Sequence, residues 1–167
     1  MRKFSLSLAV IVSVIFLATL PLLAADTTPF PQGMKIVPPD KNTVPEKLAE
    51  FSGIWEGSWD FMHGRTQDAA LAVVKLTKDE AIVIYSRGKL EIDQKRGGGI
   101  SMDPGWKRYP GCPVEKADDG NYVITVKLAQ GGSLKMKQTS NKELIHVTLS
   151  ASMGQVADQT RPFTKKK

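Results

Sequence analysis

The sequence predicts an all-β protein in which an antiparallel meander of seven or eight strands closes into a small barrel after one short helical turn. Three observations predict this fold. Apolar and polar residues alternate over short runs that are separated by turn-forming residues. Helical periodicity is confined to one turn that begins at Glu46. A tryptophan-rich stretch at residues 51–59 opens the series of strands.

The stretch 51–59 is expected to form the first strand. Because side chains alternate between the two faces of a strand, Trp55, Gly57, Trp59 and Phe61 share one face. Two indoles on that face fill much of a small core. The missing side chain at Gly57 lets the strand bend or lets another group approach closely.

The later runs have the length and patterning of strands. They lie at 69–76, 81–86, 89–93, 122–128, 134–137 and 144–150, and an eighth is expected between 156 and 163. Most connections are short, so strands that are neighbours in sequence are neighbours in the sheet. Each strand has one apolar face, and closure of the sheet on itself is the simplest way to cover those faces.

The N-terminus has the three parts of a secretory signal peptide, which we place at residues 1–25. A basic start at Arg2 and Lys3 precedes an apolar run at 4–23, and small residues follow at Ala24 and Ala25. An uncleaved membrane anchor is the alternative, because the run approaches bilayer-spanning length. Cleavage predicts an exported protein, periplasmic or secreted, with no membrane span.

The mature chain divides into three parts. Residues 26–45 hold five of the ten prolines and are expected to form an extended leader or tether. Residues 46–164 form the barrel domain, which opens with a helical turn over 46–51. Residues 165–167 are a basic tail of three lysines.

Charge and cysteine content narrow the class of protein. The net charge of +6 becomes +4 without Arg2 and Lys3, and clustered basic and aromatic motifs are missing, so nucleic acid is not an expected partner. Cys112 is the only cysteine, which excludes an internal disulfide. Its proline and glycine neighbours place it in a loop, as a buried small residue, a free thiol or half of an intermolecular bridge.

The start of the barrel resembles the calycin group, which includes lipocalins and fatty-acid-binding proteins. The resemblance is carried by Gly53-Ile54-Trp55 and by Arg161 near the chain end. It implies a ligand-binding barrel in which Arg161 packs across Trp55. The chain lacks the long helix before the last strand and the disulfides of lipocalins. It also resembles small exported bacterial domains that open with Trp-x-Gly-x-Trp, here Trp55, Gly57 and Trp59.

A long loop is expected between residues 93 and 121, and it contains the candidate ligand-binding residues. Trp106 and Tyr109 flank Lys107 and Arg108. The two rings could stack on a flat ligand or a sugar while the two cations hold an acidic group. The structural alternative is that Trp106 caps an open end of the barrel and Tyr109 packs beneath the loop.

The sequence selects no catalytic residues, metal ligands or cofactor. His63 and His146 are far apart and lack metal-ligand spacing. The triple glycine at 97–99 lacks the context of a phosphate-binding loop. An enzyme would need Asp60, His63 and a second acid to converge in a cleft.

The leading functional hypothesis is an exported, non-enzymatic binding module that accepts a small apolar or amphipathic ligand in a lipocalin-like barrel. The alternative is a structural or interaction protein of the envelope. It would bind a partner or an anionic polymer through the basic tail at 165–167 and the long loop.

Overall fold

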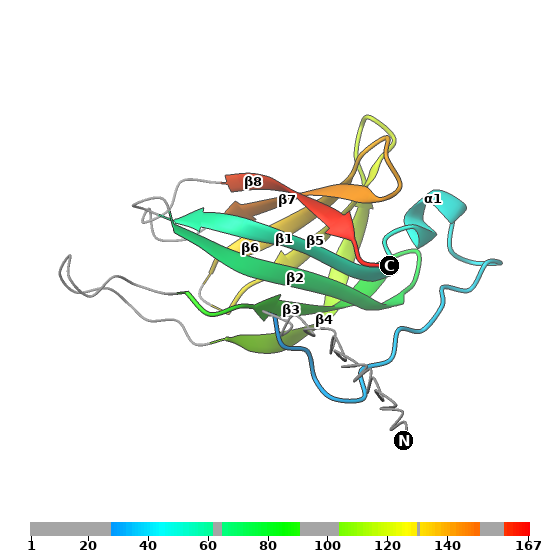
Figure 1. Ribbon diagram of the computed structural model, residues 1–167. Coiled ribbons are helices and arrows are strands. Elements are labelled where there is room, and N and C mark those ends of the chain that lie inside the picture. The colour runs from blue at the N-terminus through cyan, green and yellow to red at the C-terminus, as the bar shows by residue number, and fades with distance from the viewer. Residues whose placement is uncertain (1–27, 62–64, 91–103, 130, 151–158) are drawn as a thin grey trace, which may run out of the picture.

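A computed structural model describes residues 28–61, 65–90, 104–129, 131–150 and 159–167. Eight strands form a closed barrel in chain order, and every neighbouring pair is antiparallel (Figure 1). The strands are β1 (Gly53–Phe61), β2 (Arg65–Leu76), β3 (Glu80–Arg87), β4 (Gly105–Lys116), β5 (Tyr122–Lys127), β6 (Ser133–Gln138), β7 (Leu144–Ser150) and β8 (Gln159–Lys165). One helical turn, α1 (Glu46–Ala49), precedes them. The predicted fold class is confirmed.

The prediction of a long loop over residues 93–121 is wrong for residues 105–116, which form β4, and residues 93–103 lie outside the described residues. Prolines and glycines suggested turns there, but a β-bulge accommodates two of them. Pro110 and Gly111 together lie opposite the single residue Ile82 of β3, and Gly111 has a positive φ of 63°. Of the strand predicted at 89–93, only residues 89 and 90 lie within the described residues.

Cys112 therefore lies on β4 rather than in a loop. Its side chain is buried in the barrel core, and its thiol donates a hydrogen bond to the Tyr109 carbonyl at 3.3 Å. Burial raises the pKa of the Cys112 thiol to about 11. The thiol behaves as a small buried apolar group, the first of the three expected roles.

The core depends on the close approach of β8 to Gly57 in β1. The Phe163 ring lies against Gly57, and a Cβ atom at Gly57 would be only 2.6 Å from the ring. The ring packs against Trp59, with centroids 5.3 Å apart. Trp55, Trp59 and Phe163 are almost fully buried. The glycine between the tryptophans thus makes room for a third aromatic ring.

Residues of the proline-rich leader between Pro29 and Val37 pack on the barrel. Its Phe30 and Met34 contact an apolar patch on the outer face of β2 and β3, formed by Ala72, Val74 and Ile84. The Val37 amide donates to the Val74 carbonyl at 2.8 Å, and the Ser86 hydroxyl donates to the Pro29 carbonyl. We call residues 28–39 the strap (Figure 1).

A glycine substitution tests the packing of Phe163. Gly57→Ala is expected to lower the free energy of unfolding by about 1–3 kcal/mol, because the new methyl group overpacks the core. Gly105→Ala on β4 is the matched control, since no atom lies within 4 Å of its added Cβ. Urea denaturation measures both, and equal stability changes would contradict the packing role of Gly57.

Candidate functional site

The two ends of the barrel differ, and α1 closes one of them. Leu48 and Phe51 are buried in the core at this end. Carbonyls at the end of a short helix lack partners within the helix. Three barrel side chains donate to carbonyls in and after α1: Gln138 to Lys47, Lys165 to Glu50 at 2.8 Å, and Trp55 to Phe51 at 2.8 Å. We call this the α1 end.

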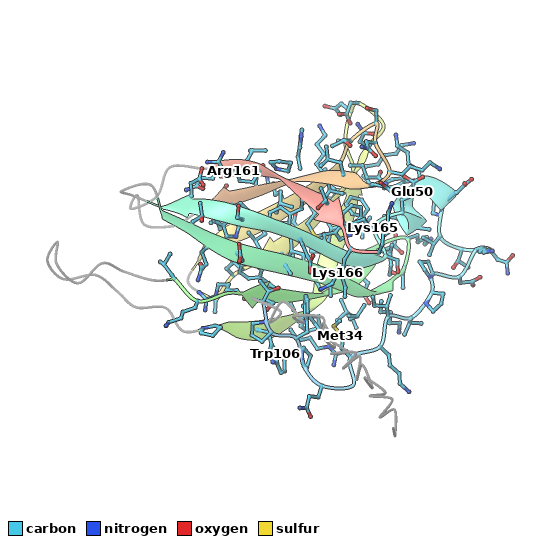
Figure 2. All side chains as sticks on the ribbon, viewed as in Figure 1. Met34, Glu50, Trp106, Arg161, Lys165 and Lys166 are labelled. Carbon is cyan, nitrogen blue, oxygen red and sulfur yellow. The ribbon has the colours of Figure 1, made fainter. Side chains whose placement is uncertain are left out.

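Lys165, rather than Arg161, lies over the first-strand tryptophan. Its ammonium nitrogen is 5.1 Å from the centroid of the Trp55 ring. Figure 2 shows Lys165 near Glu50 at the α1 end and Arg161 toward the opposite end. Gly53, with φ of 130°, accommodates the lysine stem, because an added Cβ would lie 2.9 Å from Lys165 Cε. The position expected for the calycin arginine is therefore held by a lysine.

Arg161 instead helps to join β8 to β1 where their backbones separate. Backbone pairing joins Trp55 to Lys165 and Glu56 to Thr164. Farther along, Arg161 forms an ion pair with Asp60. The Gln159 amide donates to the Asp60 carbonyl at 2.6 Å and accepts from the Asp60 amide at 3.2 Å. The side-chain amide of Gln159 thus satisfies the Asp60 backbone groups where backbone pairing between β1 and β8 is missing.

The opposite end is the candidate site, and we call it the mouth. It is the end at which β3 finishes and β4 begins, and the inward-facing residues of its β2–β4 side include polar, aromatic and cationic side chains. Tyr85 lies opposite Lys107, Val83 lies opposite Tyr109, and Arg87 follows Tyr85 on the same face of β3. The mouth residues are Gln67, Tyr85, Arg87, Lys107 and Tyr109.

Buried hydrogen bonds form the floor of the mouth. The Trp59 indole donates to the Tyr85 hydroxyl at 2.9 Å. The Gln67 amide donates to the Gly88 carbonyl at 2.8 Å. Tyr109 packs partly against the core, and the Lys107 ammonium lies 5.7 Å from its ring centroid. These contacts fix the two tyrosines and place a cation beside them.

Burial disfavours ionisation of both phenols at the mouth. Burial raises the pKa of Tyr85 to about 12, and the Trp59 indole and the Arg87 charge partly oppose this shift. Burial also raises the pKa of Tyr109, and Arg87 again opposes it. Both phenols therefore remain hydrogen-bond donors to an incoming acceptor. Arg87 supplies positive charge near both.

The four predicted ligand-binding residues lie on one strand but face two ways. Lys107 and Tyr109 face the inside of the barrel at the mouth. Trp106 and Arg108 face outward, opposite Ser86 and Ile84 of β3, and Trp106 is 48% exposed. Trp106 therefore does not cap the barrel. A role of the four in ligand binding stays a prediction.

Sequence reasoning missed Tyr85, Arg87 and Gln67. Tyr85 lies in the run 81–86 that was predicted as a strand, and Arg87 directly follows that run. The available signal was the alternation Val83, Tyr85, Arg87, which places all three on the inner face. Gln67 lies just before the run predicted as the second strand.

The basic tail is not a free tail. Lys165 belongs to β8, one residue beyond the predicted domain limit. The Lys166 ammonium lies 2.8 Å from Glu56 Oε1, and the Lys167 ammonium lies 3.3 Å from Glu143 Oε1. The lysines of residues 165–167 thus contact the barrel.

Three further features concern possible metal ligands, the histidines and a surface hollow. Over the described residues, no group of three His, Cys, Asp or Glu side chains is placed to hold a metal ion. His146 is exposed on the outer face of β7, and His63 lies outside the described residues. A surface hollow of about 630 Å³ contains no core residue; it is lined by Thr43, Thr77, Lys78, Asp79, Glu80, Gly111 and Pro113.

Comparison of the chain with known protein families, curated proteins and solved structures gives no match. The barrel is consistent with a calycin-like architecture. Within the described ranges, no helix is long and apolar enough to cross a membrane. The predicted signal peptide at 1–25 lies outside those ranges.

Removal of the Lys165 ammonium tests the closure of the α1 end. Lys165→Met keeps an aliphatic stem but removes the bond to Glu50 and the contact with Trp55, so we expect a loss of about 1–3 kcal/mol. Lys167→Met removes the same charge from an exposed ion pair and is expected to cost under about 0.5 kcal/mol. Thermal and urea unfolding measure both. Equal effects would contradict the role of Lys165.

The raised pKa of Tyr85 predicts that the protein loses stability at alkaline pH. The Tyr85 phenol of the folded protein keeps its proton up to about pH 12, whereas the same phenol in the unfolded chain loses it near pH 10. The free energy of unfolding should therefore fall as pH rises from 10 to 12, by roughly 2–3 kcal/mol, and be unaffected by this group below pH 10. Urea unfolding is measured in a Cys112→Ala background, which removes the thiol titration.

Tyr85→Phe in that background provides the comparison. It should cost about 1–2 kcal/mol at pH 7, because the Trp59 indole loses its acceptor. The variant should also lose most of the decline between pH 10 and 12. An unchanged decline would show that another group causes it.

Proposed function

We propose that this protein is an exported, non-enzymatic binding module that takes a small amphipathic ligand at the mouth of its barrel. The observation that supports it best is the inward-facing set of Tyr85, Tyr109 and Lys107 at the end opposite α1. Aromatic surface favours an apolar group, and phenol and ammonium donors favour an acceptor or an anion. The calycin-like architecture supports the same role.

The packed core limits the depth of the ligand. Trp55, Trp59 and Phe163 fill the interior, and α1 covers the far end. The proposed ligand therefore occupies the outer part of the barrel, above the Trp59–Tyr85 hydrogen bond. This is a shallower site than a lipocalin-like barrel with an open interior would offer.

The alternative function, an envelope protein that holds an anionic polymer by its tail, has less support. Lys165, Lys166 and Lys167 each contact an oxygen of the barrel or of the segment around α1. Binding of a polymer by these groups would have to replace those contacts. The loop part of the proposal loses its basis because Trp106 and its neighbours lie on β4.

A pair of adjacent residues gives a matched test. Lys107 faces the mouth, whereas Arg108 carries the same charge on the outer face of the same strand. Binding of dansyl-labelled undecanoate is followed by fluorescence. Lys107→Gln should weaken binding at least fivefold, and Arg108→Gln should change it less than twofold.

Two outcomes would contradict the proposal. The first is no saturable binding of the probe or of competing dodecanoate and dodecanol. The second is an equal effect of the two substitutions, which would place the probe outside the mouth. Stronger competition by dodecanoate than by dodecanol is expected, because Lys107 and Arg87 favour an anion.

A further inference from the structure

The outer face of β5–β8 has an unusual composition. None of the outward-facing residues in these strands, as far as the structure describes them, is acidic. Three are lysines and six carry hydroxyl groups. These residues are Val123, Thr125, Lys127, Ser133, Lys135, Lys137, Leu144, His146, Thr148, Ser150, Thr160, Pro162 and Thr164. We call this surface the lysine–hydroxyl face.

Strand register arranges the face in rows across the sheet. One row runs Thr125, Lys135, Thr148 and Thr160, and the hydroxyls of the last two lie 2.8 Å apart. A second row runs through Lys127, Ser133 and Ser150, and a third includes Lys137, His146 and Pro162. Adjacent strands are about 4.8 Å apart, and alternate residues of one strand are about 6.8 Å apart. Lysines and hydroxyls thus alternate over a surface of several strands.

The outer face of β1–β3 differs from the lysine–hydroxyl face in its charged residues and in the strap that packs on it. Outward positions of β1 and β2 include Glu56, Asp60 and Asp68. The strap covers the apolar patch on β2 and β3. The outer face of β1 and β2 thus carries acidic residues, of which Glu56 pairs with Lys166 and Asp60 with Arg161, whereas the lysine–hydroxyl face carries none among its described residues. At the edge of that face, Asp119 of the β4–β5 turn lies 2.7 Å from Lys137.

We propose that the lysine–hydroxyl face binds an acidic polysaccharide. Its ammonium groups complement repeated carboxylates, and its hydroxyls can exchange hydrogen bonds with sugar hydroxyls. The face contains no Phe, Tyr, Trp or Arg, so it offers no platform on which nucleic-acid bases would stack. The proposal concerns a different surface from the mouth and does not depend on the amphipathic ligand.

The test measures binding of fluorescein-labelled polygalacturonate by anisotropy in 50 mM salt. Lys127→Gln, Lys135→Gln and Lys137→Gln combined should weaken binding at least tenfold. The matched control is Lys41→Gln, Lys47→Gln and Lys78→Gln, which removes the same charge from exposed positions outside the face. The control should weaken binding less than threefold. Circular dichroism verifies that both variants are folded.

Two further variants distinguish binding at the lysine–hydroxyl face from non-specific attraction by the net charge of the protein. Asp119→Asn frees Lys137 and should strengthen binding about two- to threefold. Thr148→Val with Thr160→Val keeps the shape and the charge but removes the paired hydroxyls, and should weaken binding about threefold. Equal losses in the two lysine triples, no binding by the native chain, or tighter binding of a single-stranded oligonucleotide would overturn the proposal. So would unchanged binding by the threonine variant.

Discussion

The close approach of β8 to β1 is the constraint on which the rest of the barrel depends. Gly57 leaves space that the Phe163 ring fills, and Gly53 leaves space that the Lys165 stem fills. Both glycines lie on the same strand as the two buried tryptophans. The spacing Gly-x-Trp-x-Gly-x-Trp therefore reflects one packing arrangement. The glycines of β1 leave room for large side chains of β8.

This closure also makes the two ends of the barrel different. The Lys165 ammonium lies between the Trp55 ring and the Glu50 carbonyl. The same residue therefore contacts β1 from β8 and holds α1 over the end of the barrel. Partial burial lowers the pKa of the Lys165 ammonium, because desolvation disfavours its charged form. At the mouth, by contrast, the Arg87 charge acts on both tyrosine phenols, and the Lys107 ammonium lies beside the Tyr109 ring. A closed end and a polar end are consistent with the proposed binding of a ligand at the mouth.

The sequence was sufficient for the fold class, because alternation and short turns are local signals. The first-strand face of Trp55 and Trp59 was also predictable from alternation alone. The sequence alone was insufficient where tertiary contacts override the preference of the local composition. Pro110 and Gly111 suggested a loop but form a bulge within β4, and the proline-rich strap packs on an apolar outer patch that only the assembled sheet creates.

The candidate site was predicted only in part, for the same reason. Lys107 and Tyr109 were selected as part of a loop cluster, but strand geometry separates them from Trp106 and Arg108. The alternation Val83, Tyr85, Arg87 indicates the face on which Tyr85 lies, but only cross-strand register places it opposite Lys107. The exchange of Arg161 for Lys165 over Trp55 likewise depends on how β8 meets β1. A resemblance based on residue type alone could not distinguish the two cations.

The most direct test is an NMR titration of the ¹⁵N-labelled protein with dodecanoate. The account predicts saturable chemical-shift changes at the backbone amides of Tyr85, Lys107 and Tyr109 and at the Trp59 indole. The amides of α1 and the Trp55 indole should stay unchanged, because that end is sealed. Saturable changes centred on α1 and Trp55, with none at the mouth, would contradict it.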